Sequence, residues 1–188
     1  MKKNKFFLLV IVGLTGISLT SPASAATPKM PARIISLSPS ATENLFALGV
    51  GKTVVAVDDN SNFPAGVPTS NLSSFNPNVE AIVKFKPDLV ILQATASKAE
   101  AVAKQLKTLK ISVYLEKTPS DLDGVYKEIT DLGALTGKQL KARILINTIK
   151  VARITAIATA KKRTSVTFFH EVDNNLYSAT SSTFIGKV

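Results

Sequence analysis

Polar side chains follow four short apolar runs of this sequence. They occupy residues 38–40, 58–60, 93–95 and 116–118, and most are uncharged or acidic rather than basic. In an open parallel sheet, ligands gather beyond the carboxyl ends of the strands. If the four runs are parallel strands, these residues meet along one side of the sheet, which we call the polar edge. These side chains could recognise a ligand through hydrogen bonds. Each position alone is equally compatible with an ordinary loop.

The groups that catalysis requires are scarce. The chain has no Cys and a single His, His170, which excludes a cysteine nucleophile and a Cys-based zinc site. Ser38 and Ser40 lack the Gly-x-Ser-x-Gly context of a nucleophile elbow. Asp58 and Asp59 are neighbours on an extended segment, so their carboxylates point apart. We therefore expect no enzyme activity, no metal ligands, no catalytic residues and no cofactor.

Alternating strands and helices must position the polar groups. Short β-branched and apolar runs predict strands at residues 33–38, 53–57, 89–92 and 111–115, and helical spacing follows each of them. This alternation predicts a parallel α/β layer with right-handed crossovers. The continuous apolar run at 89–92 is typical of a strand that is buried on both faces.

Capping residues mark the predicted starts of three helices. Ser40 and Glu43 form the S-x-x-E capping box of the first helix, and Gly49 ends it. The predicted boundaries of the next three helices are Asn76 with Pro77 at the start, residues 98–109, and Ser120 to Leu135.

A longer helix is predicted over residues 138–161, where no helix breaker occurs. Roughly 24 residues span about 36 Å, so we expect this helix to span something larger than one sheet. Eight basic and no acidic residues lie between Lys138 and Arg163. We interpret them as a solvated helix face; an anionic membrane surface or a nucleic acid is the alternative, and the lack of interleaved aromatic residues disfavours nucleic acid. The stripe that predicts the helix is Leu140, Ile144, Thr148, Val151 or Ala152, Thr155 and Ala158.

The first 25 residues have the pattern of a secretory signal peptide. Three lysines precede the apolar run at 6–19, and Ala23-Ser24-Ala25 is a small-x-small cleavage pattern. We expect export to the periplasm or the outer side of the cell envelope, without a lipid anchor because no Cys is present. Loss of three lysines would lower the net charge from +10 to +7.

The last residues resemble the start of another α/β unit. A strand is predicted at 164–169, a turn at 178–182 and a first helical turn at 183–188. We interpret the stop at this point as truncation. The predicted organisation is a signal peptide at 1–25, an N-terminal α/β lobe at 26–137, a connecting helix at 138–163 and an incomplete second lobe at 164–188.

The sequence resembles the periplasmic binding proteins that serve cobalamin and ferric-siderophore ABC importers, the helical-backbone class. The resemblance rests on the segments RIISLSPSATENLFALGVGKTVVAVDD, NFPAGVP and NPNVEAIVKFKPDLVIL. It implies an α/β fold with a parallel-sheet N-terminal lobe, a long inter-lobe backbone helix and a second α/β lobe that is only begun. It also implies an exported, monomeric protein that delivers a small-molecule metal chelate to ABC permease subunits and binds no nucleic acid.

The resemblance assigns roles to individual residues. In this family a surface glutamate on each lobe docks onto arginines of the transporter, and Glu80 matches that position in the first lobe. A helix N-terminal charge that the dipole favours is also compatible with this position of Glu80. Cobalamin, a ferric siderophore and haem all remain open as ligands. The candidate cleft residues are Ser38, Pro39, Ser40, Asp59, Asn60, Ser74, Phe75, Gln93 and His170.

Two alternatives to a transport role remain. A secreted α/β enzyme or a surface interaction module could use the same scaffold, because fold alone does not fix function. An inactive fragment of a binding protein is the other alternative.

Overall fold

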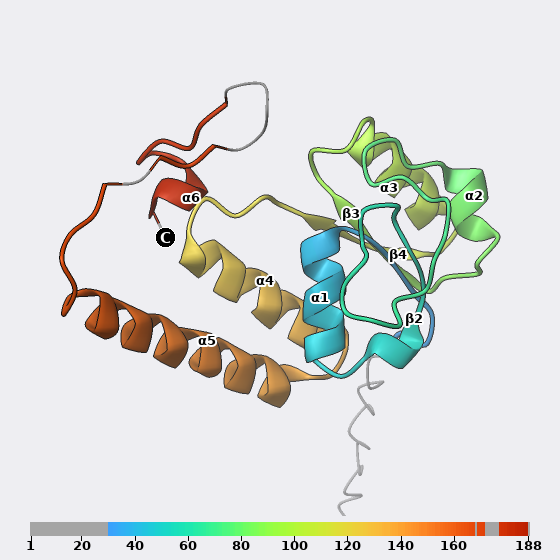
Figure 1. The fold of residues 1–188 in the computed structure, drawn as a ribbon. Coiled ribbons are helices and arrows are strands. Elements are labelled where there is room, and N and C mark those ends of the chain that lie inside the picture. Colours follow the sequence, from blue (N-terminus) through green and yellow to red (C-terminus); the bar gives the residue numbers. More distant parts are fainter. Residues whose placement is uncertain (1–29, 168, 172–176, 188) are drawn as a thin grey trace, which may run out of the picture.

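Four parallel strands form the sheet that the alternating pattern predicts. The computed structural model describes residues 30–167, 169–171 and 177–187. The strand order is β2-β1-β3-β4, and every neighbouring pair is parallel (Figure 1). The parallel α/β fold class is thereby confirmed. The strands are β1 (Ile34–Leu37), β2 (Val54–Val57), β3 (Leu89–Gln93) and β4 (Ser112–Glu116).

Helices cover both faces of this sheet (Figure 1). The face that carries α1, α4 and α5 buries Ile34, Leu45 and Leu132 in one apolar cluster. The opposite face buries Ile35 and Leu106 in a second cluster with α2 and α3. Successive residues of one strand therefore contribute to opposite clusters, as the pleat requires. The helices are α1 (Pro39–Ala47), α2 (Val79–Val83), α3 (Ala99–Thr108), α4 (Leu122–Leu135), α5 (Gln139–Ala160) and α6 (Phe184–Lys187), with a 3-10 turn η1 (Gly51–Thr53) before β2.

Three predicted helix caps are wrong by one or two residues. Ser38 rather than Ser40 caps α1, because Pro39 takes the first helical position and leaves Ser38 Oγ to accept from Ala41 N at 3.3 Å. Asn78 rather than Asn76 caps α2, and Asp121 rather than Ser120 caps α4. Both side chains accept a hydrogen bond at 2.9 Å from the amide three residues later, which is the reach that a cap needs. Gly49 follows α1 with a φ of 78°, as predicted.

The predicted long helix is present as α5, with 22 residues. It packs lengthwise on α4 (Figure 1) through Ala142, Leu145, Ile146 and Ile149. The apolar stripe that predicted this helix lies on the other side: Leu140 is 62% exposed and Val151 is 63% exposed. Two faces of α5 are apolar, and periodicity alone could not tell which one meets α4.

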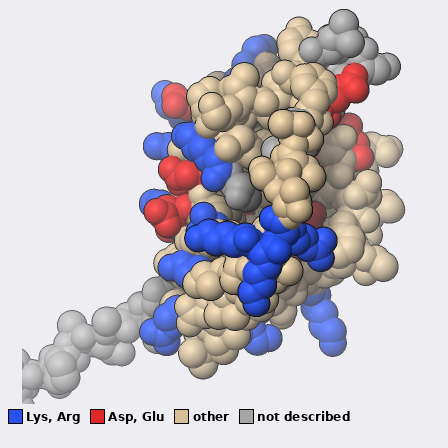
Figure 2. Space-filling model, turned by 60° about the vertical axis from the view of Figure 1, so that its left-hand side comes forward, with Lys and Arg blue, Asp and Glu red and all other residues tan. Residues whose placement is uncertain are grey.

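Basic side chains gather on the side of the molecule that carries α5 (Figure 2). Arg143, Lys150 and Arg153 are exposed on this helix, as a solvated face requires. Lys150 Nζ also lies 4.8 Å from the centre of the Tyr126 ring of α4, in cation–π geometry. None of the helices among the described residues combines the length and the apolarity that a bilayer crossing needs.

The C-terminal segment differs from its prediction. Residues 164–167 and 169 are exposed and form no strand, because none of the strands among the described residues lies beside them to pair with. The only pairing described there is an isolated antiparallel bridge between Glu171 and Ser178. A helical turn follows at α6, near the predicted start at residue 183. The predicted signal peptide at 1–25 lies outside the described residues.

Candidate functional site

The ends of the four strands meet at the polar edge, as the sequence predicts. Leu37 of β1 is in register with Leu92 of β3, and Gln93 of β3 is in register with Glu116 of β4. Ser36 of β1 is in register with Val57 of β2. The segments that follow these residues therefore share one side of the sheet, where a ligand can contact several of them at once.

Buried hydroxyl groups connect the segments that follow β1 and β2. Thr42 Oγ1 on α1 lies 2.9 Å from Ser36 Oγ, 2.8 Å from the Ser38 carbonyl oxygen and 3.1 Å from Ser61 Oγ. Ser61 Oγ donates to Asp58 Oδ2 at 2.6 Å. Asp58 is only 2% exposed, so these bonds satisfy a carboxylate that would otherwise be costly to bury. The network fixes the start of α1 against the loop after β2.

A second group of bonds orders the exposed part of the polar edge. Asn60 N donates to Asp58 Oδ1 at 2.8 Å. Asn60 Nδ2 reaches Asp59 Oδ1 at 3.1 Å and Ser74 Oγ at 3.3 Å. Three of the predicted site residues, Asp59, Asn60 and Ser74, are thus brought together. Phe75 follows Ser74, is 68% exposed, and offers an apolar surface beside them.

Ser40 joins the polar edge to a pair of buried acids. Its Oγ lies 3.1 Å from Ser38 Oγ and donates to Glu116 Oε1 at 2.7 Å. Glu128 of α4 accepts from Asn44 Nδ2 at 2.9 Å. Burial, followed by the charge of Glu116, raises the pKa of Glu128 to about 7. These acids lie behind Ser40 rather than on the surface.

Burial also raises the pKa of Tyr114, the residue of β4 two positions before Glu116. The carboxylate of Asp131 is the next cause, because Tyr114 Oη donates to Asp131 Oδ2 at 3.1 Å. The same Oδ2 accepts from Lys127 Nζ at 2.6 Å. The neutral phenol is therefore the form that the fold maintains beside the acid pair.

The remaining predicted cleft residues have different surroundings. Gln93 is half-buried at the end of β3, and its carbonyl accepts from Ala96 N at 3.1 Å. Pro39 is half-buried at the start of α1. His170 is exposed in the C-terminal segment, where its carbonyl accepts from Ala179 N at 3.3 Å. None of the described contacts joins His170 to the polar edge.

Sequence reasoning missed Asn44 and Glu128. Both lie on apolar helix faces: Asn44 between Ala41 and Leu48, and Glu128 between Val125 and Leu132. A polar residue on an apolar helix face predicts a buried hydrogen bond, since a buried polar group needs a partner inside the fold.

Glu80 is in the first turn of α2, and its side chain is exposed. This is the placement that the sequence predicts for a surface acid. Asn78 caps this helix by accepting from Ala81 N, so Glu80 is not the capping residue.

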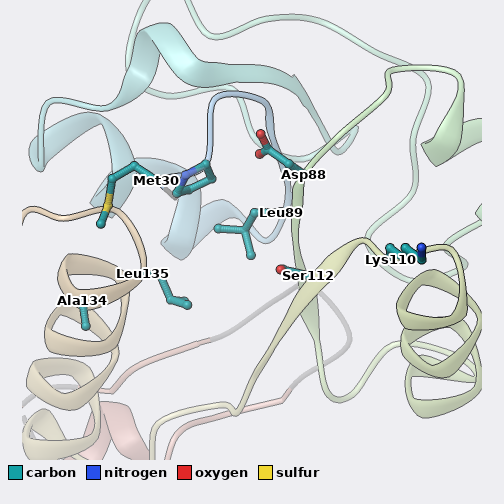
Figure 3. A pocket seen from close by; sticks show the side chains of 8 residues that line it. Met30, Asp88, Leu89, Lys110, Ser112, Ala134 and Leu135 are labelled. Carbon is teal, nitrogen blue, oxygen red and sulfur yellow. The ribbon is translucent and has the colours of Figure 1, made fainter. Parts of the chain in front are cut away.

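A pocket of about 510 Å³ opens at the opposite edge of the sheet (Figure 3). Asp88 lines it, but both oxygens of this carboxylate are in use: they accept from Ala32 N at 2.9 Å and from Arg33 N at 3.1 Å. Arg33 Nε in turn donates to the carbonyl oxygens of Phe85 and Lys86, each at 3.0 Å. The border of the pocket is therefore structural: Asp88 holds the backbone of Ala32 and Arg33 in place. Its lining residues are Met30, Pro31, Asp88, Leu89, Lys110, Ser112, Ala134 and Leu135.

Residues 34–188 match the family model described as periplasmic binding protein. An uncharacterized ABC transporter substrate-binding lipoprotein of Bacillus subtilis strain 168 is 38% identical over 124 residues, which cover 65% of this chain and 40% of that one. A cobalamin-binding protein of Halobacterium salinarum is 29% identical over an alignment that covers 99% of this chain and 59% of that one. The chain thus spans 40% to 59% of the length of these two relatives.

Solved structures share the fold. A possible iron-binding (periplasmic solute-binding) protein from Staphylococcus epidermidis superposes with a TM-score of 0.71 at 30% identity, over 84% of this chain and 63% of that one. The periplasmic vitamin B12 binding protein of Vibrio cholerae superposes with a TM-score of 0.65 at 21% identity, over 84% of this chain and 62% of that one. At that identity the likeness shows the fold alone.

Proposed function

Because the chain belongs to the periplasmic binding protein family, we propose that it is the exported ligand-binding component of an ABC importer. Its ligand is a metal chelate, namely cobalamin, a ferric siderophore or haem. The observation that carries the proposal is the polar edge itself, where hydrogen-bonding groups of four strand ends converge in a chain of this family. The metal enters as part of the cargo, and the protein supplies no resident cofactor.

The surface chemistry of the polar edge supports a neutral or mixed ligand. Ser40, Asn60 and Gln93 offer hydroxyl and amide groups, and the exposed ring of Phe75 offers apolar contact. Binding sites for large organic ligands combine apolar surface with a few well-placed polar groups in this way. No group of three or more potential His, Cys, Asp or Glu ligands occurs among the described residues, so recognition of a bare metal ion has no support there.

Ligand binding is tested on the purified chain by thermal unfolding and tyrosine fluorescence. Cyanocobalamin, haem and a ferric hydroxamate siderophore are each titrated to saturation or to the solubility limit. We expect one chelate to raise the midpoint temperature, since a ligand that binds only the folded state stabilises it in proportion to RT ln(1 + [L]/Kd). Asn60→Ala should reduce this rise several-fold, whereas Ser112→Ala at the opposite edge should not change it. The absence of any rise with all three chelates would contradict the proposal.

We further propose that Glu80 docks the protein, acting as a monomer, onto basic groups of the permease subunits. Glu80→Lys should weaken association with the permease at least tenfold and leave chelate affinity unchanged, because the side chain is exposed and lies outside the polar edge. The measurement is retention of the chain on permease-containing liposomes as salt is varied. Glu100→Lys is the matched control, since Glu100 is also exposed in the first turn of a helix, α3. Equal retention of the Glu80 variant and the wild type would refute the assigned role.

A further inference from the structure

The side of α5 that faces away from α4 carries large apolar side chains in contact with solvent. They recur at intervals of three, four and seven residues, so they lie on one face of the helix, which we call the outer stripe. An apolar stripe that runs along a whole helix points to a partner, because isolated apolar residues are the usual finding on a free surface. The residues of the outer stripe are Leu140, Ile144, Val151 and Ile154, each between 57% and 64% exposed.

The threonines beside the outer stripe add little polarity to it. Thr148 Oγ1 donates to the carbonyl oxygen of Ile144 at 3.0 Å, and Thr155 Oγ1 donates to that of Val151 at 2.9 Å. Both hydroxyl groups are therefore satisfied within the helix and need no water or outside partner. Asn147 is the polar residue that interrupts the stripe between Ile144 and Val151.

Basic side chains border the outer stripe, and no acid accompanies them. At 100° per residue, Arg143, Lys150 and Lys161 lie along one border of the stripe and Lys141 along the other. All four are exposed. Residues 138–163 contain eight basic residues and no Asp or Glu. The ion pair described in this structure lies within α4, so it neutralises none of the charges on α5.

The position of α5 leaves this face accessible. Helix α5 runs along the outside of the lobe (Figure 1), and basic side chains cover the side of the molecule that carries it (Figure 2). Every residue from 151 to 163 is exposed, so the part of the C-terminal segment that the structure describes does not pack over this half of the helix. A helix of 22 residues is about 33 Å long and can lie lengthwise on a flat surface.

The partner that fits this face is both negatively charged and apolar. A helix with an apolar stripe between basic side chains is typical of proteins that lie on a membrane surface. A second copy of this chain fits less well, because two α5 helices would bring cations against cations with no carboxylate on either. Nucleic acid would match the charge but would leave the outer stripe in water.

We propose that the outer stripe and its bordering basic residues dock this protein onto an anionic lipid surface. The apolar side chains enter the boundary between headgroups and acyl chains, while Arg143, Lys150 and Lys161 reach the lipid phosphates beside them. Lipid docking goes beyond the proposed function and does not depend on it. If both hold, docking raises the concentration of the receptor near its permease without any added contact between the two proteins.

Vesicle sedimentation of the purified full chain tests the proposal. One set of vesicles contains equal parts of phosphatidylglycerol and phosphatidylcholine, and the other contains phosphatidylcholine alone. We expect the chain to sediment with the anionic vesicles and to bind the neutral ones roughly tenfold or more weakly. Added salt should weaken binding to the anionic vesicles, because it screens the basic side chains. Failure to sediment with the anionic vesicles at low salt would overturn the proposal.

Two substitutions test the outer stripe itself. Ile144→Gln combined with Val151→Gln removes the centre of the stripe and keeps good helix formers, so we expect roughly tenfold weaker binding to the anionic vesicles. Leu109→Gln is the control, since Leu109 is 55% exposed at the end of α3, and it should bind as the wild type does. Equal binding of the stripe variant and the wild type would refute the role of the stripe. Circular dichroism shows that each variant is folded.

The basic border is tested by a pair of charge-removing variants. Arg143→Gln with Lys161→Gln should weaken binding to the anionic vesicles roughly tenfold. Lys104→Gln with Lys107→Gln removes the same charge from exposed positions on α3, which packs on the other face of the sheet, and should have little effect. Equal losses in the two variants would mean that net charge alone attracts the protein, and would overturn docking through α5.

Two further measurements identify other partners for this face. Sedimentation velocity without lipid should show a monomer; a dimer that the Ile144 and Val151 variant separates would assign the face to a second copy and overturn the proposal. Inorganic phosphate should release the chain from vesicles no better than chloride at equal ionic strength, and specific release by phosphate would assign the basic border to a free anion. None of these measurements uses a chelate, so lipid docking can fail while ligand binding succeeds, and the reverse.

Discussion

Replacing Leu45 by alanine is expected to lower the free energy of unfolding by about 3 kcal/mol. Leu45 lies on α1 with no exposed surface, in the apolar cluster that joins α1, α4, α5 and one face of the sheet. Truncation removes buried methyl groups and leaves a cavity that the surrounding strands cannot fill, because strand pairing holds them in register. The measurement is urea unfolding monitored by circular dichroism.

Leu140→Ala is the matched control for this substitution. The chemical change is the same, but Leu140 is 62% exposed on the outer face of α5. We expect a loss within about 0.5 kcal/mol, as is usual for surface positions. Similar losses in the two variants would contradict the placement of the core, and would mean that the outer face of α5 is covered.

Replacing Gly133 by valine is expected to cost about 2 to 3 kcal/mol, because it forces α4 and α5 apart. A Cβ atom at Gly133 would lie only 2.6 Å from Ala142 Cβ, which is closer than non-bonded carbon atoms approach each other. Ala142 is itself 2% exposed and has no room to move away. The free energy of unfolding measures the loss, and a reduced helical signal in the folded state would locate it in α5.

A double-mutant cycle separates this contact from general effects of valine in a helix. Ala142→Gly alone should cost about 1 kcal/mol through helix propensity. Combined with Gly133→Val, it should recover part of the loss, because the colliding methyl group is gone. Ala134→Val, one residue further along α4 and exposed, should be nearly neutral. Additive losses in the double variant would refute the close approach.

Strand positions and the parallel fold could be predicted because each buried strand reads as an unbroken apolar run between turn residues. The run at 89–92 is the clearest example, and all four of its residues are buried in β3. Helix starts were less predictable, since Ser38 and Ser40 are both good capping residues and only the position of Pro39 separates them. The outer stripe of α5 was misleading for a related reason: Leu140 and Ala142 lie on opposite faces that are both apolar, and tertiary contact with α4 chooses between them.

The polar edge was predictable at the level of segments but not of contacts. The carboxyl ends of parallel strands share one side of a sheet, and this rule correctly placed the segments that contain Ser40, Asn60 and Gln93 on the same side. It could not show that Ser40 binds Glu116, because the two residues are 76 positions apart and depend on the order of the strands. Glu128, whose pKa burial and the charge of Glu116 raise, comes from a helix face and follows no strand, so a rule about strand ends does not find it.

The strand order has a consequence for how the lobe folds. β1 comes first in the sequence but lies in the middle of the sheet, and its partners begin 20 residues later (Val54 against Ile34) and 55 residues later (Leu89 against Ile34). The longer loop costs only about 0.9 kcal/mol more chain entropy to close than the shorter one. Pairing with β3 also brings Asp88 to the amides of Ala32 and Arg33, which offsets this cost with local hydrogen bonds. The hydrogen bonds of Asp88 therefore help to hold the non-local pair of β1 and β3 together in the folded protein.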